Sequence, residues 1–250
     1  MGPVIWLIPA CFATALAYAT VGLAGGSTYL ALMSQAGMKS DAMRVTALAL
    51  NLIVSAGGFH QFVRAGHFQA RLLVPFAVAS IPAAFAAGLV PLSDRVFFGL
   101  LSVSLFFVAI RMIFWREPLI KPREVSWHLA WRWGPVVGAG LGALAGLVGI
   151  GGGIFLGPVL ILMGWADGKK AAAVASGFIL VNSLAGLAAH LARGNVPAVA
   201  DLAPLALAVL VGGQIGSRLG AFRLAPRSLE VGFGVMVLSV AARLGWGVWA

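Results

Sequence analysis

Charged residues are scarce in this chain. They make up 10% of its 250 residues, whereas hydrophobic residues make up 61% and the mean hydropathy is +1.00. A soluble domain of this size has about 25% charged residues. The composition therefore excludes an ordinary soluble protein and predicts an all-α polytopic membrane protein.

Acidic residues are absent from the middle of every long apolar stretch. The seven in the chain fall in connections or near segment ends: Asp41, Asp94, Glu117, Glu124, Asp167, Asp201 and Glu230. Ionisable residues at membrane depth mark proton relays and ion pathways, so a cation pump built on a buried carboxylate is not expected. The sequence also has no Cys/His cluster that could hold a metal, and we expect neither a metal nor another cofactor.

Cysteine is nearly absent as well. Cys11 is the only one, so the chain cannot form an intrachain disulfide, and no histidine lies near it in sequence to activate it. Ser176-Gly177 and His190 superficially suggest a serine–histidine pair, but Val174 stands where the Gly-x-Ser-Gly arrangement of rhomboid-like proteases has glycine. We therefore expect no enzyme, and an intramembrane enzyme is only a remote alternative.

Eight apolar stretches are each long enough for a transmembrane helix, which needs about 20 mostly apolar residues. They run approximately over residues 4–33, 42–63, 72–90, 96–115, 133–165, 171–191, 202–219 and 229–249. The first and fifth are too long for one perpendicular crossing, and glycines interrupt both. The tryptophans lie at or near segment ends or in the central connection, as expected for anchors at the membrane interface.

The two halves of the chain repeat each other. Glycines and serines recur at fixed offsets. The pairs at an offset of 127 are Gly22/Gly149, Gly25/Gly152, Gly26/Gly153 and Gly37/Gly164, and the pairs at 128 are Ser55/Ser183, Gly58/Gly186 and Gly66/Gly194. Internal repeats are common in secondary transporters. We expect an N-terminal membrane repeat over residues 1–115, a basic connection over 116–132 and a C-terminal membrane repeat over 133–250, with glycine-broken first and fifth helices.

Basic residues are densest between Arg111 and Arg132, which predicts a cytoplasmic location for this connection in a multi-pass protein of the plasma (inner) membrane. With eight crossings, nine basic residues fall on the cytoplasmic side and eight outside. The division is nearly even, so the positive-inside rule says little about the orientation of the whole chain. If the glycine breaks produce re-entrant pairs of short helices, the halves become inverted instead of parallel. Because most Lys and Arg lie in connections, the net charge of +10 predicts contact with lipid headgroups, not with nucleic acid.

The glycine breaks are the first candidate binding elements. Each glycine inside a helix costs about 1 kcal/mol relative to alanine, and freed backbone groups are tolerated at membrane depth only beside protein or a polar cavity. The positive ends of the resulting half-helices would attract an anion. The candidate residues are Gly25, Gly26, Ser27 and Thr28 in the first break and Gly151, Gly152 and Gly153 in the second. The alternative is close helix packing, which we expect for the stripes Gly138/Gly142/Gly146 and Gly212/Gly216/Gly220.

Polar residues inside later segments extend the candidate set. Asn51 and Ser55 lie on one face of the second segment, Asn182 and Ser183 lie in the sixth, and Gln214 lies in the seventh. Such groups line a pathway or hydrogen-bond to a neighbouring helix, and both interpretations stay open. His60 and His190 lie about one turn from segment ends, where each is either a proton carrier near neutral pH or a structural histidine at the interface.

These motifs resemble the TauE/SafE family of sulfite and organosulfonate exporters. The resemblance rests on Gly146-Leu-Val-Gly149-Ile-Gly-Gly-Gly153 followed by Pro158, on the partner motif over residues 22–27, and on the duplicated eight-segment layout. The first half departs from the pattern, since Ala24 replaces a glycine and no proline matches Pro158. The resemblance implies plasma-membrane transport of small anions such as sulfite, thiosulfate, sulfonates or sulfoacetate.

The leading hypothesis is a secondary transporter that exports such an anion and binds it near the middle of the bilayer, between the two glycine-broken helices. Moving one negative charge outward across about 100 mV, inside negative, releases about 2.3 kcal/mol, so a uniporter suffices. Proton coupling through His60 or His190 is the variant. A passive anion channel and a transporter of small carboxylates are the alternatives, and formation of a homo-oligomer stays open.

Overall fold

The computed structural model describes residues 5–114, 126–196 and 199–223, together with 238, 241–242 and 244–246. All regular structure in these residues is helical, which confirms the expected all-α class. Four stretches are long and apolar enough to cross a membrane: α3 (Ser40–Arg64), α4 (Ala70–Gly88), α8 (Gly168–Ala192) and Leu202–Phe222 within α9 (Val199–Phe222).

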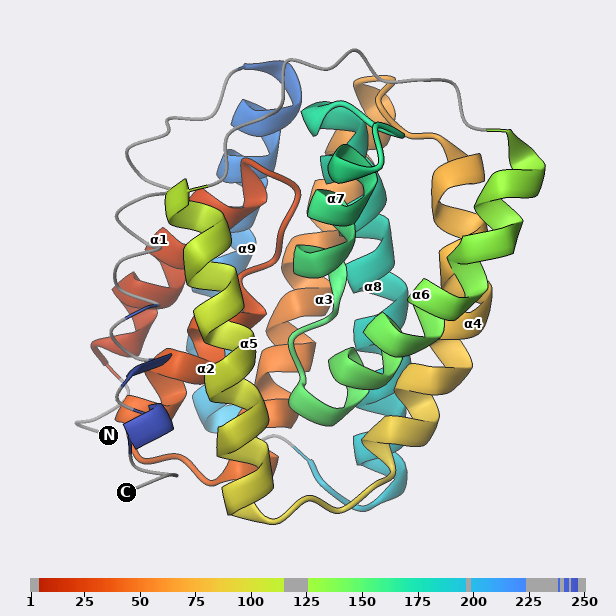
Figure 1. The fold of residues 1–250 in the computed structure, drawn as a ribbon. Coiled ribbons are helices and arrows are strands. Elements are labelled where there is room, and N and C mark those ends of the chain that lie inside the picture. Colours follow the sequence, from red (N-terminus) through yellow and green to blue (C-terminus); the bar gives the residue numbers. More distant parts are fainter. Residues whose placement is uncertain are drawn as a thin grey trace.

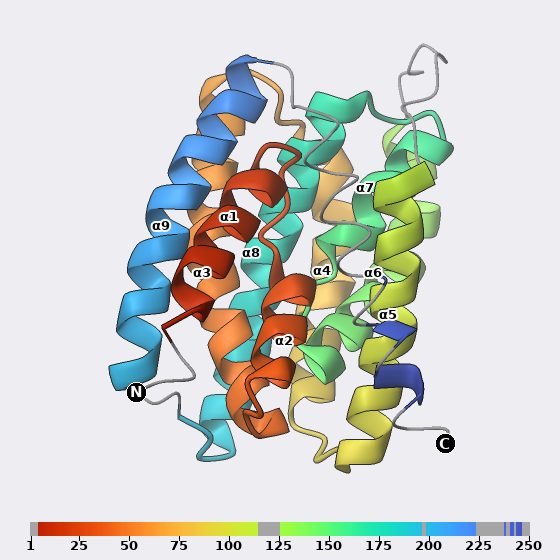
Figure 2. The same cartoon turned by 90° about the vertical axis from the view of Figure 1, so that its left-hand side faces the viewer.

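The first long apolar stretch forms two helices, α1 (Leu7–Ala19) and α2 (Gly26–Gln35). Between them, Gly22 and Gly25 have φ of 73° and 93°, a left-handed conformation that only glycine adopts readily. The connection between α2 and α3 marks what we call the lower end of the bundle, and the α3–α4 connection marks the upper end. Figures 1 and 2 show α1 rising toward the upper end and α2 returning to the lower end.

The fifth stretch forms a second hairpin, made of α6 (Trp127–Val148) and α7 (Gly153–Leu162). Gly149, Gly151 and Gly152 turn the chain here with φ of 85°, 84° and 72°. Helix α6 descends from the upper end and α7 returns to it, so the two hairpins enter the bundle from opposite ends (Figure 1). Each of the two stretches therefore forms a pair of helices that run in opposite directions.

Helix α6 begins earlier than the sequence pattern suggests. Its first residue is Trp127, within the stretch 116–132 that we expect to be a connection, because the Ser126 hydroxyl caps the helix by accepting a hydrogen bond of 3.3 Å from the Leu129 N–H. The rest of that connection, up to residue 125, and most of the expected eighth segment over 229–249 lie outside the described residues.

Helices α3 and α8 form the centre of the bundle. In their membrane-span windows 61% and 72% of residues are buried, against 44% in α4 and α9. The two helices run antiparallel, with α3 rising and α8 descending (Figure 1). Helix α5 (Asp94–Phe114) rises along one side of the bundle.

The two glycine stripes bring helices into close backbone contact. A Cβ atom on Gly142 or Gly146 of α6 would collide with the Ser80 or Ala84 carbonyl oxygen of α4. On α9, a Cβ on Gly216 would collide with the Leu16 carbonyl oxygen of α1 in the same way. The expected packing role of both stripes is confirmed, and this packing holds one long helix against the first helix of each hairpin.

Candidate functional site

Both helix breaks meet at Asn51, in the middle of α3. The Asn51 Nδ2 atom lies 3.4 Å from the Gly149 carbonyl oxygen and 3.3 Å from that of Ile150. A Cβ on Gly26, the first residue of α2, would collide with the same amide nitrogen. A Cβ on Gly151 would lie 3.3 Å from it and 3.0 Å from the Ser183 hydroxyl of α8. Four elements therefore converge on one place, where only glycine fits.

The N-termini of α2 and α7 both lie at this place, and the two helices run away from it toward opposite ends of the bundle (Figure 1). Their N-caps, Gly25 and Gly152, supply no side-chain cap. Among the described residues, no acceptor pairs with the N–H groups of Gly26, Ser27 and Thr28. Since a helix N-terminus carries about half a positive charge, the two N-termini together create a positive potential here.

Unpaired side-chain oxygens occur on the residues of the first break and of the two central helices. Five buried oxygens in the described residues lack a hydrogen-bond partner, and their side chains are at most 1% exposed: Ser27 Oγ, Tyr29 Oη, Asn51 Oδ1, Asn182 Oδ1 and Ser183 Oγ. Leaving one such atom unsatisfied costs about 1–3 kcal/mol. The hydroxyls of Ser27 and Ser183 are free to donate, so a small anion at this place would find donors from α2 and α8 as well as the helix N-termini.

The remaining candidates, apart from the histidines, are already engaged or lie elsewhere. The Thr28 hydroxyl shares a hydrogen bond of 2.7 Å with the Tyr18 hydroxyl, and the Ser55 hydroxyl donates to the Asn51 carbonyl oxygen at 2.5 Å. Gln214 of α9 lies against Gly57 of α3, about 9 Å along that helix from Asn51 at 1.5 Å per residue. The structure does not bring Gln214 to the helix breaks.

The two histidines have different environments, and neither lies at the breaks. His60 is exposed on the outer side of α3, whereas His190 of α8 is fully buried and both of its ring nitrogens lack a partner. His190 is separated from Ser183 by two helical turns, or about 10 Å.

Arg44 is a further buried polar residue that the sequence pattern does not single out. Its side chain is 1% exposed, its Nη2 atom pairs with Asp41 Oδ1 at 2.6 Å, and its guanidinium lies 5.0 Å from the centre of the Phe97 ring. A Cβ on Gly149 would lie 3.4 Å from the Arg44 Cα. The one signal in the sequence is spacing, since Arg44 precedes Asn51 by seven residues and so shares a face of α3 with it.

No group of three or more His, Cys, Asp or Glu side chains in the described ranges is arranged to hold a metal ion. These residues instead offer unpaired backbone N–H groups, hydroxyls and the amide oxygens of Asn51 and Asn182, beside two helix N-termini. The helix N-termini and the hydroxyl donors favour a small anion over a cation.

Comparison with known proteins identifies the family. The model of the family described as sulfite exporter TauE/SafE matches residues 7–244. The chain is 37% identical over 250 residues to the probable membrane transporter protein y4hK of Sinorhizobium fredii (strain NBRC 101917 / NGR234), an alignment that covers 97% of this chain and 98% of that protein. No solved structure matches the chain. The protein is therefore a membrane transporter of the TauE/SafE family.

Proposed function

We propose that the protein exports a small anion, a sulfur oxyanion or organosulfonate such as sulfite, thiosulfate or sulfoacetate, and binds it between the N-termini of α2 and α7. The observation that carries this proposal is the convergence of both helix breaks on Asn51, with the Ser27 and Ser183 hydroxyls unpaired beside it. The description of the matching family, a sulfite exporter, favours a sulfur oxyanion over other small anions.

The charge distribution supports an anion. Within the described residues, the acidic residues Asp41, Asp94, Asp167 and Asp201 lie at helix starts or caps at the ends of the bundle, and none belongs to the helix breaks. An anion there meets only N–H groups, hydroxyls and amides, so it encounters no repulsion from a fixed negative charge.

We further infer that residues 1–115 and 133–250 are inverted repeats. Helices α2 and α7 both have 10 residues, and α3 and α8 both have 25. Glycines with positive φ occur at matching positions: Gly22 and Gly149, Gly25 and Gly152, Gly37 and Gly164, Gly66 and Gly194. Because matching helices run in opposite directions (Figure 1), the site lies where an inverted-repeat transporter has it, at the interface of the two repeats.

The hairpin arrangement also makes the positive-inside rule informative. At the upper end lie eight basic residues of the described ranges: Arg64, Arg71, Arg111, Arg132, Lys169, Lys170, Arg218 and Arg223. Four lie at the lower end: Lys39, Arg44, Arg95 and Arg193. We therefore propose that the upper end faces the cytoplasm of a plasma membrane and that the lower end faces outward.

Transport requires the site to open, because Ser27, Asn51 and Ser183 are at most 1% exposed in this conformation. Movement of one hairpin against the long helices would open the site toward one end at a time, which is the alternating access of repeat-built transporters. An outward step along an inside-negative potential releases about 2.3 kcal/mol per charge at about 100 mV, so export needs no second substrate. Proton coupling through His190 is the alternative coupling mode.

Flux into proteoliposomes that contain the purified protein tests this proposal. We expect saturable uptake of radiolabelled sulfite that is driven by an inside-positive potential, competed by thiosulfate or sulfoacetate, and lowered at least tenfold in Asn51→Leu. Flux that rises linearly with concentration indicates a channel, and preference for acetate indicates a carboxylate transporter. Flux that requires a pH gradient indicates proton coupling. No flux of any of these anions contradicts the proposal.

A further inference from the structure

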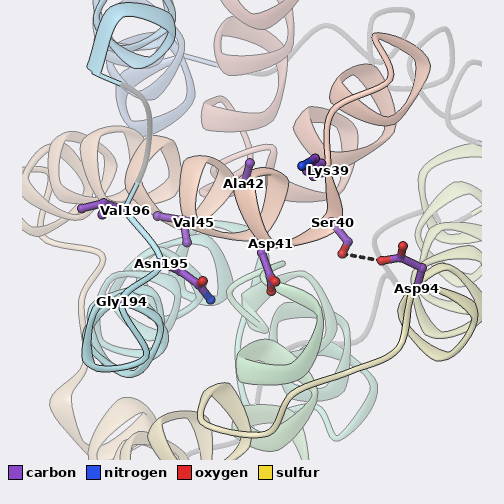
Figure 3. A pocket seen from close by; sticks show the side chains of 9 residues that line it. All are labelled: Lys39, Ser40, Asp41, Ala42, Val45, Asp94, Gly194, Asn195 and Val196. Carbon is purple, nitrogen blue, oxygen red and sulfur yellow. Dashed lines mark hydrogen bonds between the residues drawn. The ribbon is translucent and has the colours of Figure 1, made fainter.

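A cavity of about 560 Å³ lies at the lower end of the bundle, apart from the helix breaks. It is formed by the start of α3, the start of α5 and the chain that follows α8. Its lining residues, drawn in Figure 3, are Lys39, Ser40, Asp41, Ala42, Val45, Asp94, Gly194, Asn195 and Val196. The cavity therefore borders the end of both central helices.

Unpaired nitrogen atoms belong to Asn195, which lines the cavity, and to three residues within about one helical turn of its lining residues. Arg44 is one turn beyond Asp41 on α3, and His190 is in the last turn of α8, where the charges of Arg44 and Arg193 act on it. The buried atoms without a partner are Arg44 Nε, both ring nitrogens of His190, Arg193 Nη1 and Asn195 Nδ2. Those of Arg44, Arg193 and Asn195 are donors only, so this region has an excess of hydrogen-bond donors.

The nearby carboxylates do not use up these donors. Asp41 accepts from Arg44 Nη2 at 2.6 Å, and Asp94 accepts from the Ser40 hydroxyl at 2.6 Å, the bond drawn in Figure 3. Neither carboxylate is paired with Arg44 Nε, Arg193 Nη1 or Asn195 Nδ2, and these three donor atoms are buried although Arg193 and Asn195 are only half-buried as residues. Buried donors without an acceptor have a cost that a bound oxyanion would offset.

The cluster is aligned with the helix breaks. Leu48 of α3 lies 3.4 Å from the Cβ position of Gly186 on α8, and the Ser176 Cβ lies 3.8 Å from that of Gly58. This antiparallel register pairs Asn51 with Ser183 and, two turns or about 10 Å closer to the lower end, Arg44 with His190. Both pairs lie along the same α3–α8 interface.

The cluster has no counterpart at the upper end. Under the inverted repeat proposed above, the positions equivalent to Arg44, His190, Arg193 and Asn195 are Ala172, Phe62, Ala65 and His67. The fold therefore does not require basic residues at this position. Their presence at one end only indicates a task that belongs to one side of the membrane.

We propose that Arg44, His190, Arg193 and Asn195 form a second binding site for small oxyanions, which an anion occupies between the lower-end cavity and the helix breaks. This inference rests on the proposed anion transport. The site makes the lower-end access selective for anions, because an entering or leaving oxyanion exchanges its hydration for the guanidinium and amide donors of this cluster.

Equilibrium binding of radiolabelled sulfite to the detergent-purified full chain tests the second site. The wild type binds a second sulfite ion per chain, Arg44→Gln and His190→Gln each lose that ion, and Asn51→Leu loses the other one. A single ion that is lost in Asn51→Leu but kept in both Arg44→Gln and His190→Gln overturns the second site and leaves the proposed function intact. A single ion lost only in Arg44→Gln and His190→Gln supports the second site and contradicts the central one. No binding overturns both.

Thiol labelling provides a readout that does not depend on binding at the helix breaks. In a Cys11→Ala background, Asn195→Cys is allowed to react with an anionic ethylsulfonate methanethiosulfonate reagent and with a cationic one, and the same variant with Arg44→Gln added is the matched control. We expect the ratio of anionic to cationic reagent rates to fall about tenfold when Arg44→Gln is added, and to fall when sulfite is present. A ratio that neither change lowers overturns the proposal.

Discussion

Ser183 and Ser217 are both fully buried serines on long helices, but only Ser183 lies at the helix breaks. The Ser217 hydroxyl donates to the Gln214 carbonyl oxygen at 3.3 Å, whereas the Ser183 hydroxyl has no partner. We expect Ser183→Ala to weaken sulfite binding by about ten- to a hundredfold, the loss of one hydrogen bond to a charged ligand, and Ser217→Ala to leave it unchanged. Calorimetric titration of both variants measures this difference, and an equal effect in the two would place the ligand elsewhere.

Individual residues differ in how far their roles could be predicted. Ser27, Asn51 and Ser183 are rare polar groups in apolar stretches, so their clustering in the bundle could be anticipated from the cost of burying them. Arg44 could not, because an arginine near the start of a segment counts as part of a connection until a neighbouring helix covers it. Phe97 of α5 provides that cover, through a contact between residues far apart in the chain.

Gly140 and Gly142 of α6 offer a test of helix packing within one element. A Cβ on Gly142 would collide with the Ser80 carbonyl oxygen of α4, whereas a Cβ on Gly140 meets nothing within 4 Å. Gly142→Ala must push α4 and α6 apart, at a cost of about 1–3 kcal/mol, which corresponds to a fall of about 2–10 °C in Tm. Gly140→Ala should keep or raise Tm, because alanine favours the helix. Thermal unfolding in detergent measures the Tm of both variants. A fall in Tm for Gly140→Ala as large as that for Gly142→Ala would contradict the packing argument.

The helix breaks show what an element's sequence can and cannot specify. Contiguous glycines followed by Pro158 predict an interruption, because each weakens the helix. They do not predict whether the chain continues across the membrane or turns back. That outcome depends on which neighbours receive each half-helix, and here α2 and α7 pack against the central helices α3 and α8. The local sequence pattern thus predicts where the helix breaks, while tertiary packing decides whether the chain continues or turns back after the break.

At the scale of the whole molecule, the two hairpins change which basic connections lie at the same end of the bundle. With eight crossings the basic residues divide almost evenly, and the connection near Arg193 lies on the same side as Arg64 and Arg71. With hairpins the connection after α8 moves to the opposite end from the α3–α4 connection (Figure 1). Two labels, one in each of these connections, therefore distinguish the two topologies.

Val196 and Ala70 suit such a test, since both are exposed and lie just beyond α8 and at the start of α4. In a Cys11→Ala background, we expect Val196→Cys to react with an impermeant maleimide in intact cells. Ala70→Cys should react only after permeabilisation, because the upper end carries most of the basic residues and faces the cytoplasm. Sulfite flux in both variants serves as the control for correct folding. Labelling of both positions from the same side would restore eight crossings and would remove the inverted repeat on which the central site depends.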